Sequence, residues 1–267
     1  MDLTVASRTG VDRAASDDRW VALAGDRAVL LAVADGMGGT IGGGDAATVA
    51  LAALVDSLTA GVDQPQFGVE SRRSTAVAAA LAGAVAAAHA RVRSLAPDEL
   101  PVPLRGGTTL TAVVLTGRRL HLAHAGDSSC WLLRRGRLRR LTEVHTHAAA
   151  LVAAGAVEQG SAAERRLGGL LTRFLGMPGT VCPQVTTIRV RPGDRVLVAT
   201  DGVTRGLPVP ALGELLSRPG LGAADLVAAA AAAGSRDDAT ALLAAVDTAT
   251  AAGNTRYGVE EAEVPVQ

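Results

Sequence analysis

The chain contains the stretch VLLAVADGMGG at residues 29–39, a continuous apolar run that stops at Asp35 and Gly36. Such a run is typical of a strand buried on both faces, and Asp-Gly is a common turn. The same signal returns in GDRVLVATDG, residues 193–202, where Asp201 ends a second apolar run. Each aspartate alone is explained as a turn residue. Together, two buried strands that end this way predict that both carboxylates lie at one rim of the sheets.

The segments around these two runs separate strands from pairs of helices. Residues 3–23 hold two short apolar runs around a charged turn. Because strands and helices do not alternate, the order favours an α+β fold in which helices cover antiparallel sheets. Apolar runs predict further strands over 108–115, 119–125, 129–133, 185–190, 195–200 and 239–246, and helical spacing predicts helices over 45–58, 74–95, 147–155, 210–216 and 223–233.

The domain organisation follows from the lack of internal boundaries. The sequence shows no repeat and no linker, so we expect one domain over residues 1–247 and a polar, flexible tail over 248–267. The N-terminal residues carry no apolar signal core. The most apolar window, 75–92, contains His89 and Arg91, which favours a packed helix over a membrane segment. We therefore expect a cytoplasmic protein with no membrane segment.

The composition excludes several classes of function. The chain has 26 basic and 26 acidic residues, so no overall field attracts nucleic acid or an anionic membrane. Only five residues are aromatic, which leaves little for stacking against bases. Every basic residue is arginine, and without lysine neither a phosphate-binding P-loop nor a Schiff base can form. Two cysteines, Cys130 and Cys182, are too few for a four-cysteine zinc site and are expected to be buried thiols.

Three further motifs have structural explanations. The arginine-rich stretch 134–140 is interpreted as a hairpin tip that faces solvent rather than as a nucleic-acid site. Ser128 lacks the closing glycine of a nucleophile elbow, so a serine hydrolase is poorly supported. His145 and His147 stand two residues apart and would diverge, so we expect them in a solvated loop rather than on zinc.

Acidic residues are left as the candidates for chemistry. Asp17 and Asp18 precede one apolar run, and Asp237 and Asp238 precede the last one. Carboxylates gathered at one rim repel each other and become protonated unless a cation neutralises them. Hard divalent ions with oxygen ligands suit such a cluster, and two ions that share a carboxylate can activate water against a phosphoryl group.

At this point the sequence resembles a known family, the metal-dependent protein phosphatases of type 2C, which act on serine and threonine. The resemblance covers about residues 5–246, in the order of the family's motifs. The matching stretches are TGVDRAASDD (9–18), VLLAVADGMGG (29–39), RGGTTLTAVVL (105–115), HLAHAGDSSCWLLRRGRLRRLT (121–142), LLTRFLG (170–176), GDRVLVATDGVTRGL (193–207) and SRDDATALL (235–243). The combination of VADGMGG, ATDG and SRDDAT is the specific part.

The resemblance implies a fold and a metal site. The fold is a four-layer α/β/β/α sandwich, with two central antiparallel sheets flanked by helix pairs. The site holds two Mn²⁺ or Mg²⁺ ions, and Asp35 bridges them. The other positions that the resemblance assigns to the metals are the Gly36 carbonyl on one ion, Asp201 and Asp237 on the other, and Asp17 and Asp18 acting mainly through bound waters.

The resemblance also implies an activity. Arg13 matches the arginine that grips the substrate phosphate, a role that the forked guanidinium suits. A metal-bound water attacks phosphorus in line and expels the serine or threonine oxygen, with Asp18, Asp35, Asp201 and Asp237 as the catalytic set. Met37 stands where some members have a histidine, so a metal-bound water is expected to be the acid. The implied partners are phosphoprotein substrates of Ser/Thr kinases, and we expect a monomer.

Other positions depart from the family pattern and keep alternatives open. Asp17 replaces a usual glutamate, and His124, Ser129 and Val144 replace the usual residues of their block. Arg205 replaces an acid that, with the aspartate matching Asp127, supports a third metal in the family, so Asp127 is only a possible third-metal ligand. Residues 151–168 match a mobile flap that affects substrate choice. The alternatives are a weakly active or inactive regulatory or binding module and a hydrolase of small phosphate esters.

Overall fold

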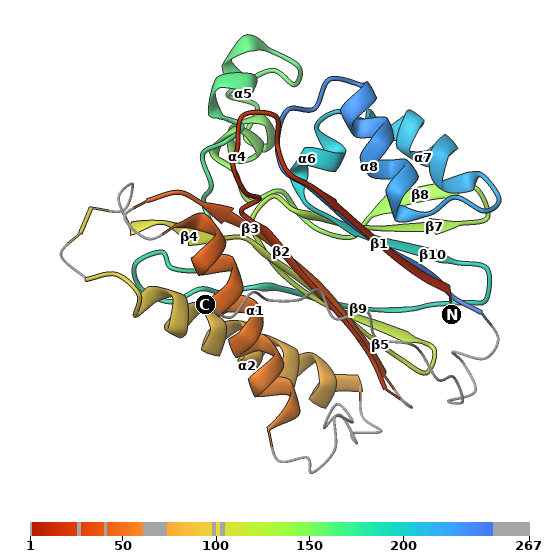
Figure 1. Cartoon of the computed structure of the whole chain (residues 1–267), viewed down its shortest axis with the longest axis horizontal. Coiled ribbons are helices and arrows are strands. Elements are labelled where there is room, and N and C mark those ends of the chain that lie inside the picture. Colours follow the sequence, from red (N-terminus) through yellow and green to blue (C-terminus); the bar gives the residue numbers. More distant parts are fainter. Residues whose placement is uncertain are drawn as a thin grey trace.

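Two antiparallel β-sheets stack face to face, and helices cover both outer faces (Figure 1). This computed structural model describes residues 2–25, 28–39, 42–60, 74–97, 100–101 and 105–247. The predicted tail, 248–267, lies outside the described residues. The four-layer α/β/β/α arrangement confirms the fold that the sequence predicts.

Each sheet is assembled from strands that are far apart in the chain. The first has the order β1 (Asp2–Arg8), β11 (Ala239–Ala245), β10 (Arg195–Ala199), β7 (Ser129–Arg134) and β8 (Arg137–Arg140). The second has the order β2 (Asp18–Ala24), β3 (Ala28–Met37), β5 (Leu110–Thr116), β6 (Arg119–Ala125) and β9 (Gln184–Arg189), and β4 (Gly107–Thr108) pairs with the end of β3. The two apolar runs around the charged turn near the N-terminus therefore enter different sheets, as β1 and β2.

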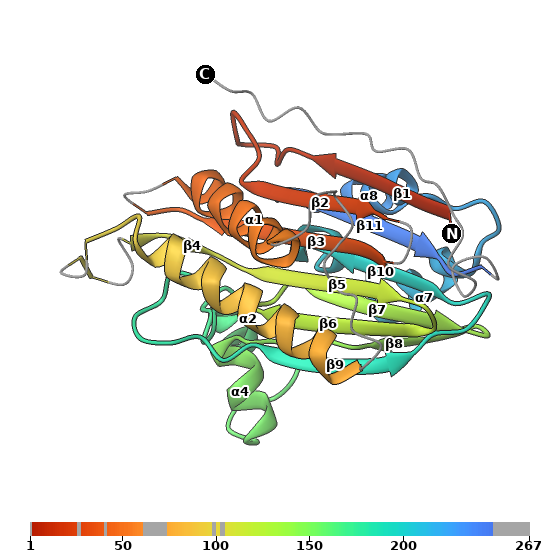
Figure 2. The same cartoon turned by 90° about the horizontal axis from the view of Figure 1, so that it is seen from below.

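The helices form the outer layers (Figures 1 and 2). The second sheet is covered by α1 (Gly43–Thr59) and α2 (Ser74–Arg93), which lie across it in Figure 2. The first sheet is covered by α6 (Asp201–Thr204), α7 (Val209–Ser217) and α8 (Ala223–Ala232). Two short helices, α4 (His147–Ala153) and α5 (Ala162–Leu167), project from one end of the sandwich, and the predicted flap, 151–168, runs from the last turn of α4 through α5.

The apolar run in β3 is explained by its place between two cores. Val29, Leu31 and Val33 pack in the core between the sheets, whereas Leu30 and Ala32 face the core under α1 and α2. Side chains alternate along a strand, so a strand with apolar layers on both sides needs apolar residues at every position. The run stops at Asp35 because the strand there reaches the rim of the sandwich.

Helix α2 is long and apolar enough to cross a membrane if length and composition alone are considered. One face of α2, however, is buried inside the protein. Val77, Leu81, Val85 and Val92 follow helical spacing and are buried in the core that α2 shares with α1. This packing agrees with the sequence interpretation of a core helix.

Two expectations about single residues were wrong. Cys182 is exposed, whereas Cys130 is buried as expected and burial raises the pKa of its thiol to about 12. His145 is buried and does not lie in a solvated loop. Its ring stacks on that of His124 at a centroid distance of 4.8 Å.

Candidate metal centre

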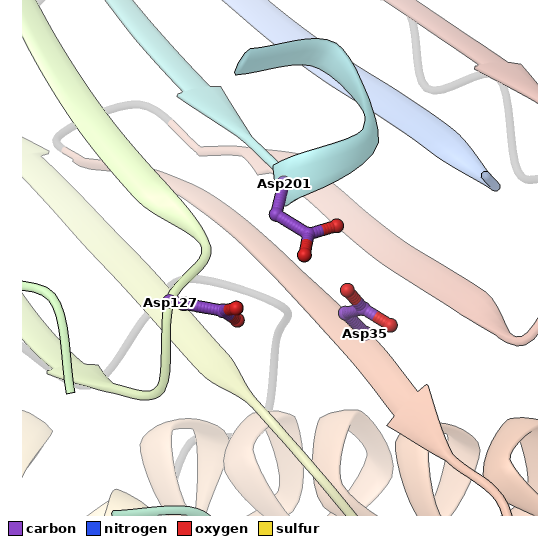
Figure 3. A group of neighbouring side chains, drawn as sticks. All are labelled: Asp35, Asp127 and Asp201. Carbon is purple, nitrogen blue, oxygen red and sulfur yellow. The ribbon is translucent and has the colours of Figure 1, made fainter. Parts of the chain in front are cut away.

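Three aspartates from distant parts of the chain meet at one rim of the sandwich (Figure 3). Asp35 lies near the end of β3, Asp127 lies in the turn between β6 and β7, and Asp201 begins α6, separated from the end of β10 by one residue. One carboxylate oxygen from each lies within 4.8 Å of the others. The convergence of Asp35 with Asp201 is the one that the two apolar runs predict.

Asp18 adds a fourth carboxylate beside this cluster. It lies opposite Asp35 in the β2–β3 pairing and is buried. Its Oδ2 accepts a hydrogen bond from the Thr200 hydroxyl at 2.8 Å, and that hydroxyl oxygen in turn accepts from the Thr240 N–H at 2.9 Å. The Thr200 side chain therefore ties Asp18 to the two strands β10 and β11.

The pKa values of the buried carboxylates are raised, because their surroundings disfavour the charged forms. Burial raises the pKa of Asp18 to about 7, and burial together with the charge of Asp127 raises that of Asp201 to about 7. Desolvation and the neighbouring Asp201 hold the pKa of Asp35 well above its ordinary value. In the described part of the chain, Asp18 Oδ1 and Asp201 Oδ1 are buried atoms without a hydrogen-bond partner. A set of oxygen-only donors with orphaned buried atoms fits a hard divalent cation.

The backbone of Asp35 is held by two threonines. The Thr109 hydroxyl accepts from the Asp35 N–H at 3.0 Å, and the Thr109 N–H donates to the Asp35 carbonyl at 2.9 Å. The Thr108 hydroxyl donates to the same carbonyl at 3.0 Å. These bonds fix the position of Asp35 independently of any ion.

Glycines next to Asp35 allow a close approach of helix α1. A Cβ atom on Gly36 would lie 2.1 Å from the Gly43 carbonyl oxygen, and one on Gly43 would lie 2.7 Å from the Gly36 carbonyl oxygen. Neither position accepts a side chain without a shift of the backbone. The glycine at position 43 leaves the Gly36 carbonyl, the predicted ligand, free of a covering side chain.

The predicted phosphate-binding residue lies at the exposed side of the site. Arg13 forms ion pairs with Asp17, with Asp237 at 3.4 Å and with Asp238 at 3.3 Å. Its side chain is 40% exposed and that of Asp237 is 38% exposed. Arg13 and Asp237 are therefore neighbours within reach of a ligand from solvent.

Asp17 is engaged by the protein. Its Oδ1 accepts from the Gly44 N–H at 2.8 Å, at the first turn of α1, and its Oδ2 accepts from Arg13. Carboxylates at this end of a helix stabilise its unpaired N–H groups. In this structure Asp17 links Arg13 to α1, and its predicted action through metal-bound water stays a prediction.

Asp238 has a role that the sequence reasoning missed. It is buried, and its two oxygens accept from the Gly10 N–H at 2.7 Å and the Asp17 N–H at 2.8 Å. Asp238 thereby fastens both ends of the loop that carries Arg13. A signal was present, because successive residues of an extended segment point in opposite directions. One carboxylate of the Asp237–Asp238 pair therefore had to point into the protein.

Arg205 enters the acidic cluster from α6. Its guanidinium lies 2.5 Å from Asp201 Oδ2, 3.3 Å from Asp127 Oδ2 and 3.9 Å from Asp237 Oδ2. The residue that departs from the family pattern is thus an internal cation between three of the carboxylates. Arg205 therefore neutralises part of the negative charge of these carboxylates.

The His124–His145 pair supports the turn that carries Asp127. His145 Nδ1 accepts from the Gly126 N–H at 3.1 Å. His124 Nε2 donates to the Glu143 carbonyl at 3.0 Å, and its Nδ1 accepts from the Thr111 hydroxyl at 2.8 Å. Burial lowers the pKa of His124 to about 3 and that of His145 to about 4, so both rings are neutral near pH 7.

The molecule is thus an α/β/β/α sandwich with a cluster of oxygen donors at one rim that fits divalent cations. Comparison with known proteins specifies the family. The family described as Protein phosphatase 2C matches residues 11–246, and the chain belongs to this family. The resemblance recognised in the sequence is therefore confirmed.

Two curated relatives illustrate the similarity. The serine/threonine protein phosphatase PstP of Mycobacterium tuberculosis is 36% identical over 199 residues, which are 74% of this chain and 35% of the relative. The chain thus spans about a third of the length of PstP. The serine/threonine phosphatase stp of Listeria monocytogenes is 28% identical over 195 residues, 72% of this chain and 73% of the relative.

Solved structures agree with this assignment. The catalytic domain of PstP in complex with two manganese ions is 32% identical, covers 92% of this chain and 98% of its own, and gives a TM-score of 0.74. The phosphatase MsPP from Mycobacterium smegmatis in complex with cacodylate is 30% identical, covers 91% and 97%, and gives a TM-score of 0.73.

Proposed function

We propose that the chain is a metal-dependent protein phosphatase that hydrolyses phosphoserine and phosphothreonine. The observation that carries the proposal is the meeting of Asp35, Asp127 and Asp201 within 4.8 Å, beside buried carboxylate oxygens that have no partner. The residues that would hold two Mn²⁺ or Mg²⁺ ions are Asp35, Gly36, Asp201 and Asp237, with Asp18 behind them. When bound, such ions supply an acidified water and a positive clamp for the phosphoryl oxygens.

The residues of the chain would then position the substrate and control charge. Arg13 offers its forked guanidinium to two phosphate oxygens from the exposed side of the site. Asp238 holds the Arg13 loop through Gly10 and Asp17, so the guanidinium is placed before substrate binds. Thr200 and Thr109 fix Asp18 and Asp35, which limits movement of the carboxylates during the reaction.

We also propose the substrates, the cellular location and the oligomeric state of the protein. The substrates would be phosphoproteins modified by Ser/Thr kinases, the protein would act in the cytoplasm, and it would act as a monomer. The relatives named as serine/threonine phosphatases support the first point. No protein nucleophile is required, which agrees with the structural role of Ser128, whose hydroxyl bonds to that of Thr109 at 2.8 Å.

Hydrolysis of an aryl phosphate tests the proposal. Purified protein with Mn²⁺ should hydrolyse the ester, EDTA should stop the reaction, and Asp201→Asn and Asp237→Asn should each abolish it. Asp56→Asn is the matched control, because Asp56 is exposed on α1, away from the cluster. Turnover that survives Asp237→Asn would contradict the metal assignment. A phosphothreonine peptide should be a better substrate than a phosphotyrosine peptide, and a preference for small esters would favour the small-ester hydrolase instead.

A second candidate function is a phosphatase-like binding or regulatory module with weak or no turnover. The observation that favours it is the 2.5 Å ion pair of Arg205 with Asp201, which places a fixed cation on a predicted metal ligand. This module would bind Mn²⁺ in calorimetry but release little or no phosphate from aryl or peptide substrates. Rapid Mn²⁺-dependent turnover that Asp201→Asn abolishes would exclude it.

A further inference from the structure

The β7–β8 hairpin carries a concentration of positive charge that the metal centre does not use. Residues 134–140 contain five arginines and no acidic residue, in a chain whose formal net charge is zero. Two of the five have partners. Arg134 pairs with Asp194 at 2.6 Å, and the Arg140 guanidinium lies 5.5 Å from the centre of the Trp131 ring.

The other three arginines have no such partner. Arg135, Arg137 and Arg139 are exposed, and within the described residues no acidic side chain lies within 4 Å of their guanidinium groups. Unpaired charges that stand close together repel each other and attract anions from solvent. This part of the surface therefore favours anionic ligands.

These arginines line a concave surface. A recess of about 520 Å³ is bounded by Leu132, Arg134, Arg135, Arg137 and Arg139, and is called the arginine recess below. The strand register places Arg139 opposite Leu132 and Arg137 opposite Arg134. Directly opposed residues of antiparallel strands share a face, and Leu132 packs in the core between the sheets. The recess therefore lies on the sheet face that looks toward the second sheet, at the outer edge formed by β8.

The hairpin presents the charges on a stiff frame. Its turn consists of Arg135 and Gly136, with φ angles of 51° and 76°. Positive φ at both positions is the geometry of a tight two-residue turn that matches the twist of its strands. Among the described residues Arg135 is the one non-glycine residue with positive φ. Asparagine or glycine would adopt this conformation more easily, so an arginine at position 135 makes the turn less stable than either of them would.

The chemistry of the recess selects its ligand. Guanidinium groups bind carboxylates and phosphates with paired hydrogen bonds. The residues that line the recess include no aromatic side chain on which a base could stack. We propose that the arginine recess docks an acidic segment of the protein substrate, rich in carboxylates or in further phosphate groups. The identity of the ligand as part of a substrate rests on the proposed function.

The position of β7 and β8 links the recess to the metal centre. Arg140, at one end of β8, donates to the Asp127 carbonyl at 3.0 Å, whereas Arg137 and the turn lie at the other end. The paired strand β7, Ser129–Arg134, runs from the Asp127 turn to the hairpin tip, and its six extended residues span about 20 Å. A substrate with acidic residues about six positions from its phosphothreonine would therefore reach both places at once.

Direct binding tests the recess without any turnover. A fluorescein-labelled acidic peptide that contains no phosphothreonine should bind the wild-type protein, and added salt should weaken the binding. Arg137→Glu and Arg139→Glu should each weaken it by about tenfold. Arg91→Glu is the matched control, because Arg91 is exposed on α2 on the other side of the molecule, and it should change binding by less than about twofold. Equal effects of Arg137→Glu and Arg91→Glu would overturn the proposal, as would tighter binding of an oligonucleotide of equal charge.

Kinetics separate this proposal from the proposed function. A phosphothreonine peptide with an acidic block about six residues away should have a lower KM than one with the block about two residues away, and Arg137→Glu should remove the difference. Hydrolysis of an aryl phosphate should be unchanged in Arg137→Glu, because that substrate does not reach the recess. If the wild type hydrolyses no aryl phosphate but still binds the acidic peptide through Arg137, the phosphatase proposal fails and the recess is supported. A KM that is independent of spacing would overturn the docking role.

Discussion

Asp201 and Arg205 form an ion pair of 2.5 Å across one turn of α6. The pair uses only Oδ2 of the carboxylate. The other oxygen, Oδ1, is buried and has no hydrogen-bond partner in the described chain. One oxygen of the Asp201 carboxylate is thus paired with the Arg205 guanidinium, and the other is open to a ligand. The same guanidinium lies 3.3 Å from Asp127 Oδ2.

Removal of the Arg205 charge should strengthen metal binding. In Arg205→Gln no guanidinium competes for Asp201 and Asp127, and the local field becomes more negative, so we expect Mn²⁺ to bind about tenfold more tightly. The metal-free variant should melt at a lower temperature than the wild type, because the carboxylates then repel each other without an internal counter-charge.

Titration calorimetry and thermal melts in EDTA measure these two effects. Arg205→Lys keeps the charge and should stay close to the wild type in both measurements. Weaker Mn²⁺ binding by Arg205→Gln would show that the arginine supports the ion instead of competing with it.

The stability of the metal-free protein should fall as the pH rises from 5 to 8. Burial raises the folded-state pKa of Asp18 and Asp201 from about 3.8 to about 7, so the folded protein binds more protons than the unfolded chain between these values. Stability from these groups is therefore full below about pH 4 and is lost as the pH passes 7. Bound Mn²⁺ should remove this loss, because it stabilises the charged carboxylates.

Urea unfolding at a series of pH values, with EDTA or with Mn²⁺, checks this dependence. The gap between the two midpoints should widen with pH. Asp18→Asn should make the EDTA series flatter, and an EDTA series whose midpoint rises from pH 5 to 8 would contradict the assigned direction of the pKa shifts.

The fold was predictable because the residue pattern of its central strands shows that they are buried. The run 29–34 is apolar at every position since β3 lies between two cores, and no exposed strand would show this pattern. The element order then separated sheets from helices. The one-turn helix α6 was not predicted, because Asp201 and Gly202 alone signal a turn as readily as a helix start.

The site was predictable only in part. Asp35 and Asp201 follow apolar runs, so their meeting could be inferred. The roles of Thr200 and Asp238 depend on bonds to Asp18 and Gly10, which lie 182 and 228 residues away in the chain. No local pattern encodes such pairings, because they arise from the register of strands in the folded sheets. His145 was misplaced for the same reason, since its partners Gly126 and His124 come from β6 and the turn after it.

Loss of the Thr200 hydroxyl should destabilise the protein and disturb the metal centre. In Thr200→Val both the Asp18 carboxylate and the Thr240 N–H lose a partner while they stay buried, at a cost of about 1–3 kcal/mol. The lost hydrogen bond is one that lowers the pKa of Asp18, so that pKa should rise further and Mn²⁺ should bind more weakly at neutral pH.

Urea denaturation and calorimetry measure the two effects of this substitution. Thr200→Ser retains the hydroxyl and should recover most of both. Equal losses in the serine and valine variants would mean that the methyl group, not the hydroxyl, is what matters at this position.

Two glycine-to-alanine substitutions should change stability in opposite directions. A Cβ atom at Gly202 would lie 1.8 Å from the Asp238 carbonyl oxygen, which is backbone and cannot move aside freely. Gly202→Ala should therefore push β11 away from α6 and cost several kcal/mol, on the order of the largest single substitutions. Gly83 lies exposed within α2, and a Cβ atom there would meet nothing within 4 Å, so Gly83→Ala should stabilise the helix by roughly 0.5–1 kcal/mol.

Thermal melts with and without Mn²⁺ distinguish the two sites further. The shift that Mn²⁺ produces should be preserved in Gly83→Ala, because α2 does not carry a ligand. It should be reduced in Gly202→Ala, because the clash pushes position 202 away from Asp238, and the chain neighbours of these two residues, Asp201 and Asp237, are proposed to hold the same ion. A Gly202→Ala protein with a wild-type Mn²⁺ shift would show that the Asp-Gly turn and the segment before β11 move independently of the metal centre. The close packing of the two segments would then have no part in holding the carboxylates together.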